Sequence, residues 1–250
     1  MIVLITGATA GFGKATAQLF ASKGFDLIIT GRRTQRLNDL KKEIESMHKV
    51  NVIALDFDIR NFSQVERAIN ELPDSFKKIE LLVNNAGLAV GMSSIHDGLI
   101  DDWERMVDTN VKGLLYMTRI VSPLMIQQKR GHIINVGSIA GKEVYPNGNV
   151  YCATKFAVDA LNRGMRMDLV QHGIKVSSIN PGMAETEFSV VRFKGDEERA
   201  KNVYKGLQPL TAEDIAETIY WMYSRPAHVN INELVIMPTR QASSTVSVRE

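Results

Sequence analysis

Short apolar runs alternate with helical patterns along the whole chain of 250 residues. Seven runs rich in valine, isoleucine and leucine have the length of β-strands. Several are apolar at consecutive positions, as expected when both faces of a parallel sheet are covered. The runs are Ile2 to Ile5, Leu27 to Thr30, Val52 to Phe57, Glu80 to Val83, His132 to Val136, Lys175 to Ile179 and Glu233 to Met237.

The segments between these runs have helical spacing. From residue 33 to 47, one helix face carries Leu37, Leu40, Ile44 and Met47. From residue 63 to 72, one face carries Val65, Ile69 and Leu72. Thr211 and Asp214 have the spacing of a helix start close to a capping box, and the apolar positions Ile215, Ile219 and Met222 follow.

This alternation predicts an α/β fold, with a doubly wound, seven-stranded parallel sheet of the Rossmann type and helices on both faces. No linker rich in proline, serine or glycine divides the chain, so residues 1–250 are expected to form a single dinucleotide-binding domain. Within it, residues 183–206 are expected to form a substrate lid. Residues 241–250 are expected to be a flexible, frayed tail or an oligomer contact.

Composition and charge exclude several function classes. The single cysteine, Cys152, rules out an internal disulfide and favours a reducing, cytoplasmic compartment. The formal net charge is +2, which gives no electrostatic reason to expect nucleic-acid or membrane-surface binding. No apolar run approaches the roughly 20 residues that span a bilayer, and the amino terminus lacks the features of a signal peptide.

A glycine-rich turn follows the first strand. Gly7, Gly11 and Gly13 lie between that strand and a helical pattern, where they permit a tight turn and close approach of the backbone to a pyrophosphate. Their spacing differs from the commonest dinucleotide fingerprint, and glycines in a turn also serve simple chain reversal.

The end of the second strand reads Thr30-Gly31-Arg32-Arg33. NAD-binding proteins usually carry an acidic residue here that binds the adenosine ribose. Two guanidinium groups suit the ribose 2′-phosphate of NADP instead. Because cations at a helix amino terminus oppose the helix dipole, two arginines without a ligand are disfavoured, and we predict NADP.

Tyr151 and Lys155 lie four residues apart in a helical segment and therefore share a face. An ammonium group near a phenol stabilises the phenolate, so we expect Lys155 to lower the pKa of Tyr151. Ser138 follows the fifth strand, at the sheet edge where ligands bind, and a hydroxyl there can donate to a carbonyl oxygen. The Tyr-x-x-x-Lys spacing alone also arises in many helices.

Five ordered motifs resemble those of the short-chain dehydrogenase/reductase family, and they cover essentially the whole chain. They are Thr6 to Gly13, Asn84 to Gly87, Ser138, Tyr151 to Lys155 and Asn180 to Gly182. The resemblance implies that Tyr151 is the catalytic acid/base and that Lys155 lowers its pKa and holds the nicotinamide ribose. It implies that Ser138 orients the carbonyl and that Asn110 anchors a proton-relay water.

The resemblance also implies a set of cofactor contacts. Asp58 matches the adenine contact, and Thr186, as a carboxamide contact, lies in a segment that varies within the family. The full set is Gly7, Thr9, Ala10, Gly11, Phe12, Gly13, Arg32, Arg33, Asp58, Ile59, Asn85, Ala86, Gly87, Tyr151, Lys155, Pro181, Gly182 and Thr186.

Within the family, the segments 186–196 and 226–232 are similar to those of NADP-dependent 3-hydroxy acid dehydrogenases. The similarity implies oxidation of substrates such as serine, allo-threonine and 3-hydroxypropionate. In the opposite direction, it implies reduction of the carbonyl compound malonic semialdehyde. Burying a substrate carboxylate requires a partner, and Arg192 and Lys194 are the candidates, although lid cations often face water. Ser138 and Tyr151 are expected to contact the substrate as well.

Alternatives remain open. A reductase of other small ketones, sugars or carbonyls uses the same catalytic residues, whereas an NADP-sensing regulator does not need the complete set. The five histidines lack metal-ligand spacing, so no metal site is expected. Cys152 is expected to be a buried, inert thiol, and Ser138 lacks the nucleophile elbow of serine hydrolases. The helical stretches from Asp101 to Lys129 and from Asn149 to Gln171 match helices that pair between subunits in the family, which implies a homotetramer.

Overall fold

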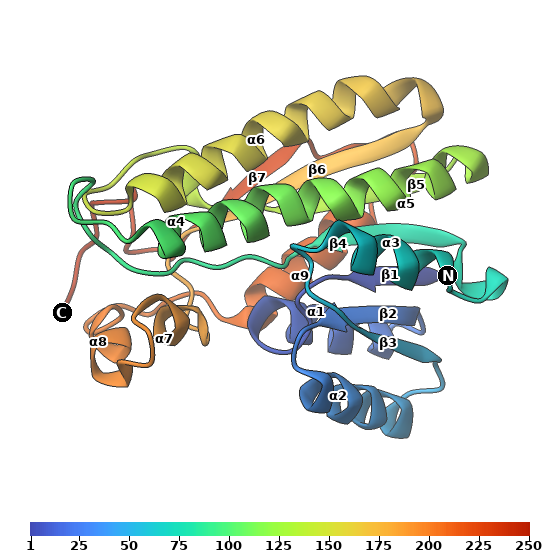
Figure 1. The fold of residues 1–250 in the computed structure, drawn as a ribbon, viewed down its shortest axis with the longest axis horizontal. Coiled ribbons are helices and arrows are strands. Elements are labelled where there is room, and N and C mark those ends of the chain that lie inside the picture. The colour runs from blue at the N-terminus through green and yellow to red at the C-terminus, as the bar shows by residue number, and fades with distance from the viewer.

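The computed structural model describes residues 1–250. Its seven strands lie in one parallel sheet with the spatial order β3-β2-β1-β4-β5-β6-β7 (Figure 1). The strands are β1 (Ile2–Ile5), β2 (Asp26–Gly31), β3 (Val52–Asp56), β4 (Ile79–Asn84), β5 (Gly131–Val136), β6 (Ile174–Pro181) and β7 (Glu233–Ile236). The predicted doubly wound sheet is confirmed, including all seven strands.

Helices connect the strands as parallel crossovers. They are α1 (Gly11–Ser22), α2 (Thr34–Met47), α3 (Phe62–Asn70), α4 (Ile100–Val107), α5 (Leu114–Gln128), α6 (Asn149–Leu169), α7 (Phe188–Arg192), α8 (Glu197–Asn202) and α9 (Ala212–Tyr223). The capping box predicted for α9 is confirmed: the Thr211 hydroxyl accepts from the Asp214 amide, and the Asp214 carboxylate accepts from the Thr211 amide.

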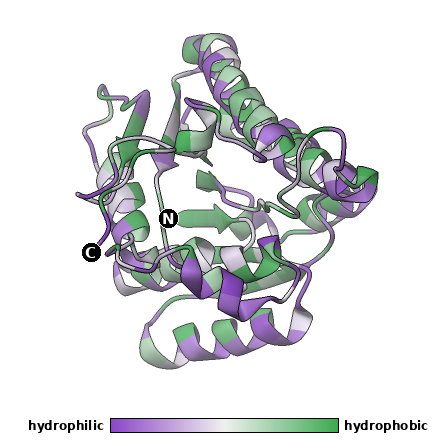
Figure 2. Ribbon diagram, turned by 90° about the vertical axis from the view of Figure 1, so that its left-hand side faces the viewer, coloured by the Kyte–Doolittle hydropathy of each residue, from purple (hydrophilic) through white to green (hydrophobic).

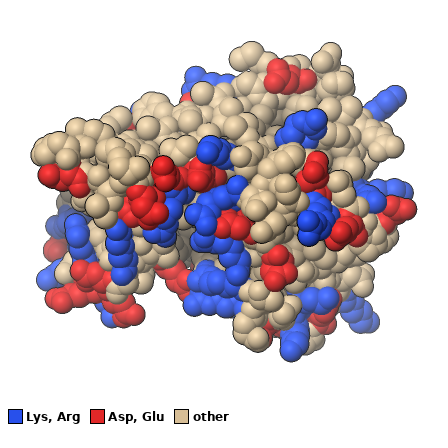
Figure 3. Space-filling model, in the orientation of Figure 1, with Lys and Arg blue, Asp and Glu red and all other residues tan.

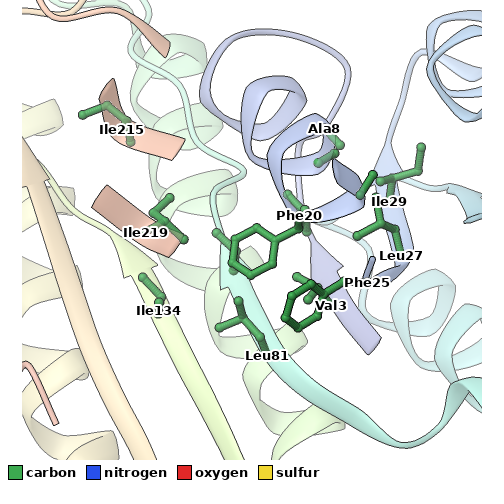
Figure 4. Packing of buried hydrophobic residues seen from close by; sticks show 14 of the residues in the cluster. Val3, Ala8, Phe20, Phe25, Leu27, Ile29, Leu81, Ile134, Ile215 and Ile219 are labelled. Atoms are coloured by element: carbon green, nitrogen blue, oxygen red, sulfur yellow. The ribbon is translucent and has the colours of Figure 1, made fainter. Parts of the chain in front are cut away.

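Two apolar cores lie on opposite faces of the sheet, because successive strand residues point to opposite faces. In β1, Val3 and Ile5 pack with residues of α1, α2 and α9, whereas Ile2 and Leu4 pack with residues of α3, α5 and α6. Figure 4 shows the first core around Phe20, which is completely buried. In Figure 2, the strands run through the middle of the fold and the helices surround them. Burying one such side chain contributes about 2 to 3 kcal/mol.

Some helix boundaries and faces differ from the sequence-based expectation. Met47 is exposed, because it lies at the last turn of α2 beyond the edge of the core that buries Leu37, Leu40 and Ile44. The expected continuous helix over 101–129 is interrupted between α4 and α5 by a π-helical turn, Asp108–Gly113. Such wider turns are frequent at functional sites, and this one carries Asn110.

The carboxyl-terminal segment is tied down rather than frayed. The Gln241 side chain is buried and accepts a hydrogen bond from the Met183 amide at 2.7 Å. The Ser244 amide donates to Glu143, and the Glu250 amide donates to the carbonyl oxygen of Gly206. Residues 241–250 therefore bind the start and the end of segment 183–206. The polar, small-residue composition of residues 241–250 did not indicate these contacts.

Candidate active site

A cavity of about 900 Å³ lies along the carboxyl ends of the central strands. The strand order reverses between β1 and β4, and ligands of open α/β sheets bind at such a switch point. Of the residues predicted to bind cofactor or substrate or to act in catalysis, all but Gly13, Asn110 and Lys194 line this cavity. The structure thus gathers side chains that are as much as 180 positions apart in the sequence.

The glycine turn after β1 is shaped by two tight requirements. Gly7 has φ +68°, which favours glycine, and a Cβ at Gly13 would lie 2.5 Å from the Gly7 carbonyl oxygen. The Asn85 side-chain amide donates to the Thr6 carbonyl oxygen at 2.8 Å and to that of Gly7 at 3.2 Å. Asn85 therefore braces the turn from the end of β4, in addition to lining the cavity.

The two arginines after β2 have different partners. Arg33 donates to the Thr9 hydroxyl through Nε and Nη2, and through Nη1 to Glu187 at 2.9 Å. Arg32 lies 3.8 Å from the Asp58 carboxylate, which is held more closely by Arg60 at 2.6 Å. Burial raises the pKa of Asp58, but the hydrogen bonds from Arg60 outweigh it and leave that pKa below its ordinary value. The Arg32 guanidinium thus has only a distant counter-ion and faces the cavity edge.

The four predicted catalytic residues come from three elements. Tyr151 and Lys155 lie on α6, Ser138 follows β5, and Asn110 lies in the π-helical turn. The Asn110 side chain accepts from the Leu88 amide and donates to the Leu88 carbonyl oxygen, each at 2.8 Å. The Lys155 ammonium donates to the Val136 carbonyl oxygen at 2.9 Å. Asn110 is thus clamped to the loop after β4 and lies behind the cavity wall.

Burial dominates the electrostatics of the catalytic pair. It raises the pKa of Tyr151 above its ordinary value, although Ser138 and Arg192 act in the opposite direction. It also lowers the pKa of Lys155 to about 8. The expectation that Lys155 lowers the pKa of Tyr151 is therefore not met in this structure. The free-energy penalty of removing the phenolate from water exceeds the stabilisation of the phenolate by neighbouring groups. The Tyr151 phenol is held in its protonated form.

Arg192 and Lys194, the two candidate partners for a substrate anion, are separated by the structure. The Arg192 guanidinium carbon lies 5.3 Å from the Tyr145 ring centre and 5.8 Å from that of Tyr151. Its Nε and Nη2 atoms are buried without a hydrogen-bond partner. Lys194 instead pairs with the buried Asp102 carboxylate at 2.8 Å and does not line the cavity. Only Arg192 keeps donors available there.

Several cavity residues were missed by sequence reasoning. The Tyr145 ring faces the Arg192 guanidinium, and the ring centres of Phe188 and Tyr151 lie 5.7 Å apart. Gln241 also lines the cavity. Tyr145 follows Ser138 by seven residues, so its position near a catalytic strand end was an available signal. Nothing in the sequence around Gln241 indicated a buried wall residue.

Cys152 lies in the environment expected of an inert thiol. Cys152 is buried, and burial raises the pKa of its thiol, which disfavours the reactive thiolate. No group of three or more His, Cys, Asp and Glu side chains gathers as metal ligands would. No helix combines the length and the apolar character needed to cross a membrane.

The residues present fit an NADP molecule. Close packing against protein atoms leaves no room for a Cβ at Gly7 or Gly13 and fixes the tight turn, and Gly7 and Gly11 line the cavity where a pyrophosphate would bind. Arg32 offers a cationic fork at the edge of the cavity, where β2 ends. The donor set thus matches a dinucleotide that carries an additional phosphate on the adenosine side.

Comparison with known proteins agrees with this geometry. The family model described as short chain dehydrogenase matches residues 1–197, well over half of the chain. The chain is a short-chain dehydrogenase. The family resemblance inferred from the five motifs is therefore confirmed.

Relatives of this short-chain dehydrogenase match it along its full length. It is 48% identical over 249 residues to the NADP-dependent 3-hydroxy acid dehydrogenase YdfG of Salmonella typhi, covering 99% of each chain. It is 46% identical over 248 residues to the sulfoacetaldehyde reductase 2 of Chromohalobacter salexigens, covering 99% of this chain and 98% of the relative. Its fold matches the closed form of a serine dehydrogenase complexed with NADP+ with a TM-score of 0.93, at 46% identity and with full coverage of both chains.

Proposed function

We propose that this short-chain dehydrogenase is an NADP-dependent oxidoreductase that interconverts a small 3-hydroxy acid and its carbonyl form. The observation that carries the proposal is the Arg192 guanidinium beside Tyr151 in the cavity, whose Nε and Nη2 atoms are buried without a hydrogen-bond partner. Buried N–H donors without a partner are costly, and an anionic substrate supplies the missing hydrogen bonds. The names of the relatives support NADP as cofactor and a small anionic substrate.

Substrate position follows from these donors. The Arg192 fork holds the carboxylate, while the Ser138 hydroxyl and the Tyr151 phenol meet the oxygen on the reacting carbon. Phe188 and Tyr145 supply apolar walls that exclude water. In a 3-hydroxy acid, one carbon atom separates the carboxylate carbon from the hydroxyl-bearing carbon. Such a substrate suits a site in which the Arg192 guanidinium lies beside Tyr151.

Proton transfer is assigned to Tyr151. When bound, NADP supplies or accepts the hydride through its nicotinamide ring. In the direction of carbonyl reduction, the protonated Tyr151 phenol donates its proton to the substrate oxygen, and its raised pKa keeps that proton available. Lys155 then places a cation near the phenolate, and Asn110 holds the α6 end and the loop after β4 together through Thr154 and Leu88.

The test of the anion site is Arg192→Gln. We expect its kcat/KM for L-serine, L-allo-threonine and 3-hydroxypropionate to fall about 10- to 100-fold, since charge-assisted hydrogen bonds contribute about 1.5 to 3 kcal/mol each. Activity toward uncharged secondary alcohols should change little. Arg199→Gln is the matched control, because Arg199 lies on α8 and stacks on Phe193. Equal losses for charged and uncharged substrates would overturn the role of Arg192.

A small hydroxysulfonate is the second candidate substrate. The similarity to a sulfoacetaldehyde reductase favours it, and a guanidinium fork binds a sulfonate as it binds a carboxylate. Spectrophotometric assays of NADP+ reduction with 2-hydroxyethanesulfonate beside the 3-hydroxy acids distinguish the two. If only uncharged alcohols react, both anionic substrates are excluded.

We also propose a homotetramer. Exposed apolar side chains lie along α4, α5 and α6, where subunit contacts would bury them: Val107, Leu115, Phe156 and Met167. Light scattering of the purified protein tests this, and a monomer at micromolar concentration would contradict it. The cytoplasmic location expected from the sequence stays a prediction, which cell fractionation tests.

A further inference from the structure

The segment 183–206, called the lid from here on, is held at two places besides its contacts with residues 241–250. In its middle, Lys194 pairs with Asp102 of α4, and the Gly91 amide donates to the Arg192 carbonyl oxygen. Near its start, the Glu187 carboxylate contacts Arg36 of α2 and Arg33, the residue before α2. Figure 3 shows basic side chains between the lid helices and α2. The second anchor lies beside the adenosine half of the cofactor site.

Glu187 is shared by two arginines. Its carboxylate lies 2.9 Å from Arg33 Nη1 and 2.8 Å from Arg36 Nη1. Burial raises the pKa of Glu187, but the hydrogen bonds from Arg33 and Arg36 outweigh it and hold the pKa below its ordinary value. The carboxylate is therefore ionised at neutral pH, and both contacts are charge-assisted.

The two arginines differ in what else they touch. Arg33 lines the cavity and also donates to Thr9 of the glycine turn. Arg36 does not line the cavity, and Glu187 is its only hydrogen-bonding and ion-pair partner. Arg36 thus contacts Glu187 from outside the cavity, whereas Arg33 contacts it from the cavity wall.

We propose that Glu187, Arg33 and Arg36 form an electrostatic latch that holds the lid over the adenosine half of the site and limits the rate of cofactor exchange. The proposal rests on the proposed NADP-dependent function. Thr9, Arg33 and Glu187 all line the cavity, and the continuous link between them joins the glycine turn to the lid. A cofactor leaving the cavity on that side requires the Glu187 contacts to break, whereas chemistry at Tyr151 does not involve them.

Stopped-flow release of NADPH tests the latch. We expect Glu187→Gln to release NADPH about three- to tenfold faster than the unaltered protein, because exposed ion pairs are individually weak. Arg36→Gln should show a smaller increase, and the double variant should release no faster than Glu187→Gln alone. Glu185→Gln is the matched control, since Glu185 is an exposed lid carboxylate without an arginine partner.

Two further readouts separate the latch from a general structural effect. High salt should speed release from the unaltered protein toward that of Glu187→Gln, because salt weakens exposed ion pairs and the Debye length falls to about 3 Å at 1 M. Hydrogen exchange of lid amides in the cofactor-free protein should be faster in Glu187→Gln and Arg36→Gln, but not in Glu185→Gln. That measurement does not depend on activity or on bound cofactor.

Several results would overturn the latch. Unchanged NADPH release together with unchanged lid exchange in both variants removes it. Tighter binding of NADPH by Glu187→Gln, without the same gain for NADH, shows that Glu187 instead competes with the 2′-phosphate for Arg33. If the unaltered protein binds no NADPH, the proposed function fails, whereas normal NADPH binding with unaltered release and exchange removes the latch alone.

Discussion

The two halves of the cavity use charge in opposite ways. On the adenosine side, Arg33 and Glu187 are about half exposed and are paired with opposite charges. On the catalytic side, Tyr151, Lys155 and Asn110 are buried, and the Arg192 fork has buried nitrogen atoms without partners. Exposed pairs are screened and individually weak, whereas buried groups change their protonation and resist being left unpaired. The first half is built to bind and release, and the second to shift protons.

The largest effect is expected from Tyr151→Phe, which removes one buried hydroxyl and changes nothing on the adenosine side. Turnover should fall by about 10³-fold, within the range of general acid–base catalysis, because no other residue in the cavity is placed to move the proton. NADPH binding, measured by fluorescence titration, should stay within about twofold of the unaltered protein. Unchanged turnover would remove Tyr151 from the mechanism.

Lys155→Met tests the energetic cost of the buried side. Burial lowers the pKa of Lys155 from its ordinary value to about 8, so the unfolded chain binds its proton more tightly than the folded chain does. Stability therefore rises with pH between about 8 and 10.5 and is reduced below that window.

Replacing Lys155 by methionine should stabilise the cofactor-free protein at pH 7 by up to about 3 kcal/mol, while it lowers turnover. Urea unfolding at pH 7 and at pH 9.5 measures this, and the stabilisation should shrink at the higher pH. Lys14→Met is the control, because Lys14 is an exposed member of an ion pair with Glu43. A pH-independent change would contradict the burial argument.

The smallest of these effects is expected on the adenosine side. Arg32→Ala with Arg33→Ala should weaken NADPH binding about 10- to 100-fold, since each charge-assisted bond contributes about 1.5 to 3 kcal/mol before screening. NADH binding should weaken by less than about threefold, and high salt should narrow the difference. Arg32→Ala alone leaves the Glu187 contacts intact. Equal losses for both cofactors would refute the 2′-phosphate role.

The local patterns of the sequence were sufficient for most of the fold. Each strand is a short apolar run. Because helices cover both faces of the sheet, strand residues are apolar at consecutive positions, and such runs predict the strands directly. The glycine turn and the Tyr151 and Lys155 pair depend on neighbours within a few residues. The π-helical turn at Asp108–Gly113 was not predictable in this way, because its wider geometry depends on packing against the Leu88 loop through Asn110.

The candidate site was predicted less completely. Arg192 and Lys194 are two residues apart, and the sequence gives both as equal candidates for binding a carboxylate. In the structure, Lys194 forms an ion pair with Asp102, more than 90 positions away, whereas Arg192 lines the cavity. The same limit applies to Gln241, whose burial depends on the Met183 amide. Residues 241–250 carry no periodicity, so only their partners reveal that they are held in place.

The sequence by itself determined the sheet, the phosphate turn, the spacing of the catalytic pair and the paired arginines after β2, because each depends on residues close together along the chain. Tertiary structure alone decided the raised pKa of Tyr151, the two buried Arg192 nitrogen atoms without hydrogen-bond partners, and the contact of Glu187 with Arg33 and Arg36. Those properties depend on desolvation and on partners distant in sequence, and neither exists until the chain has packed.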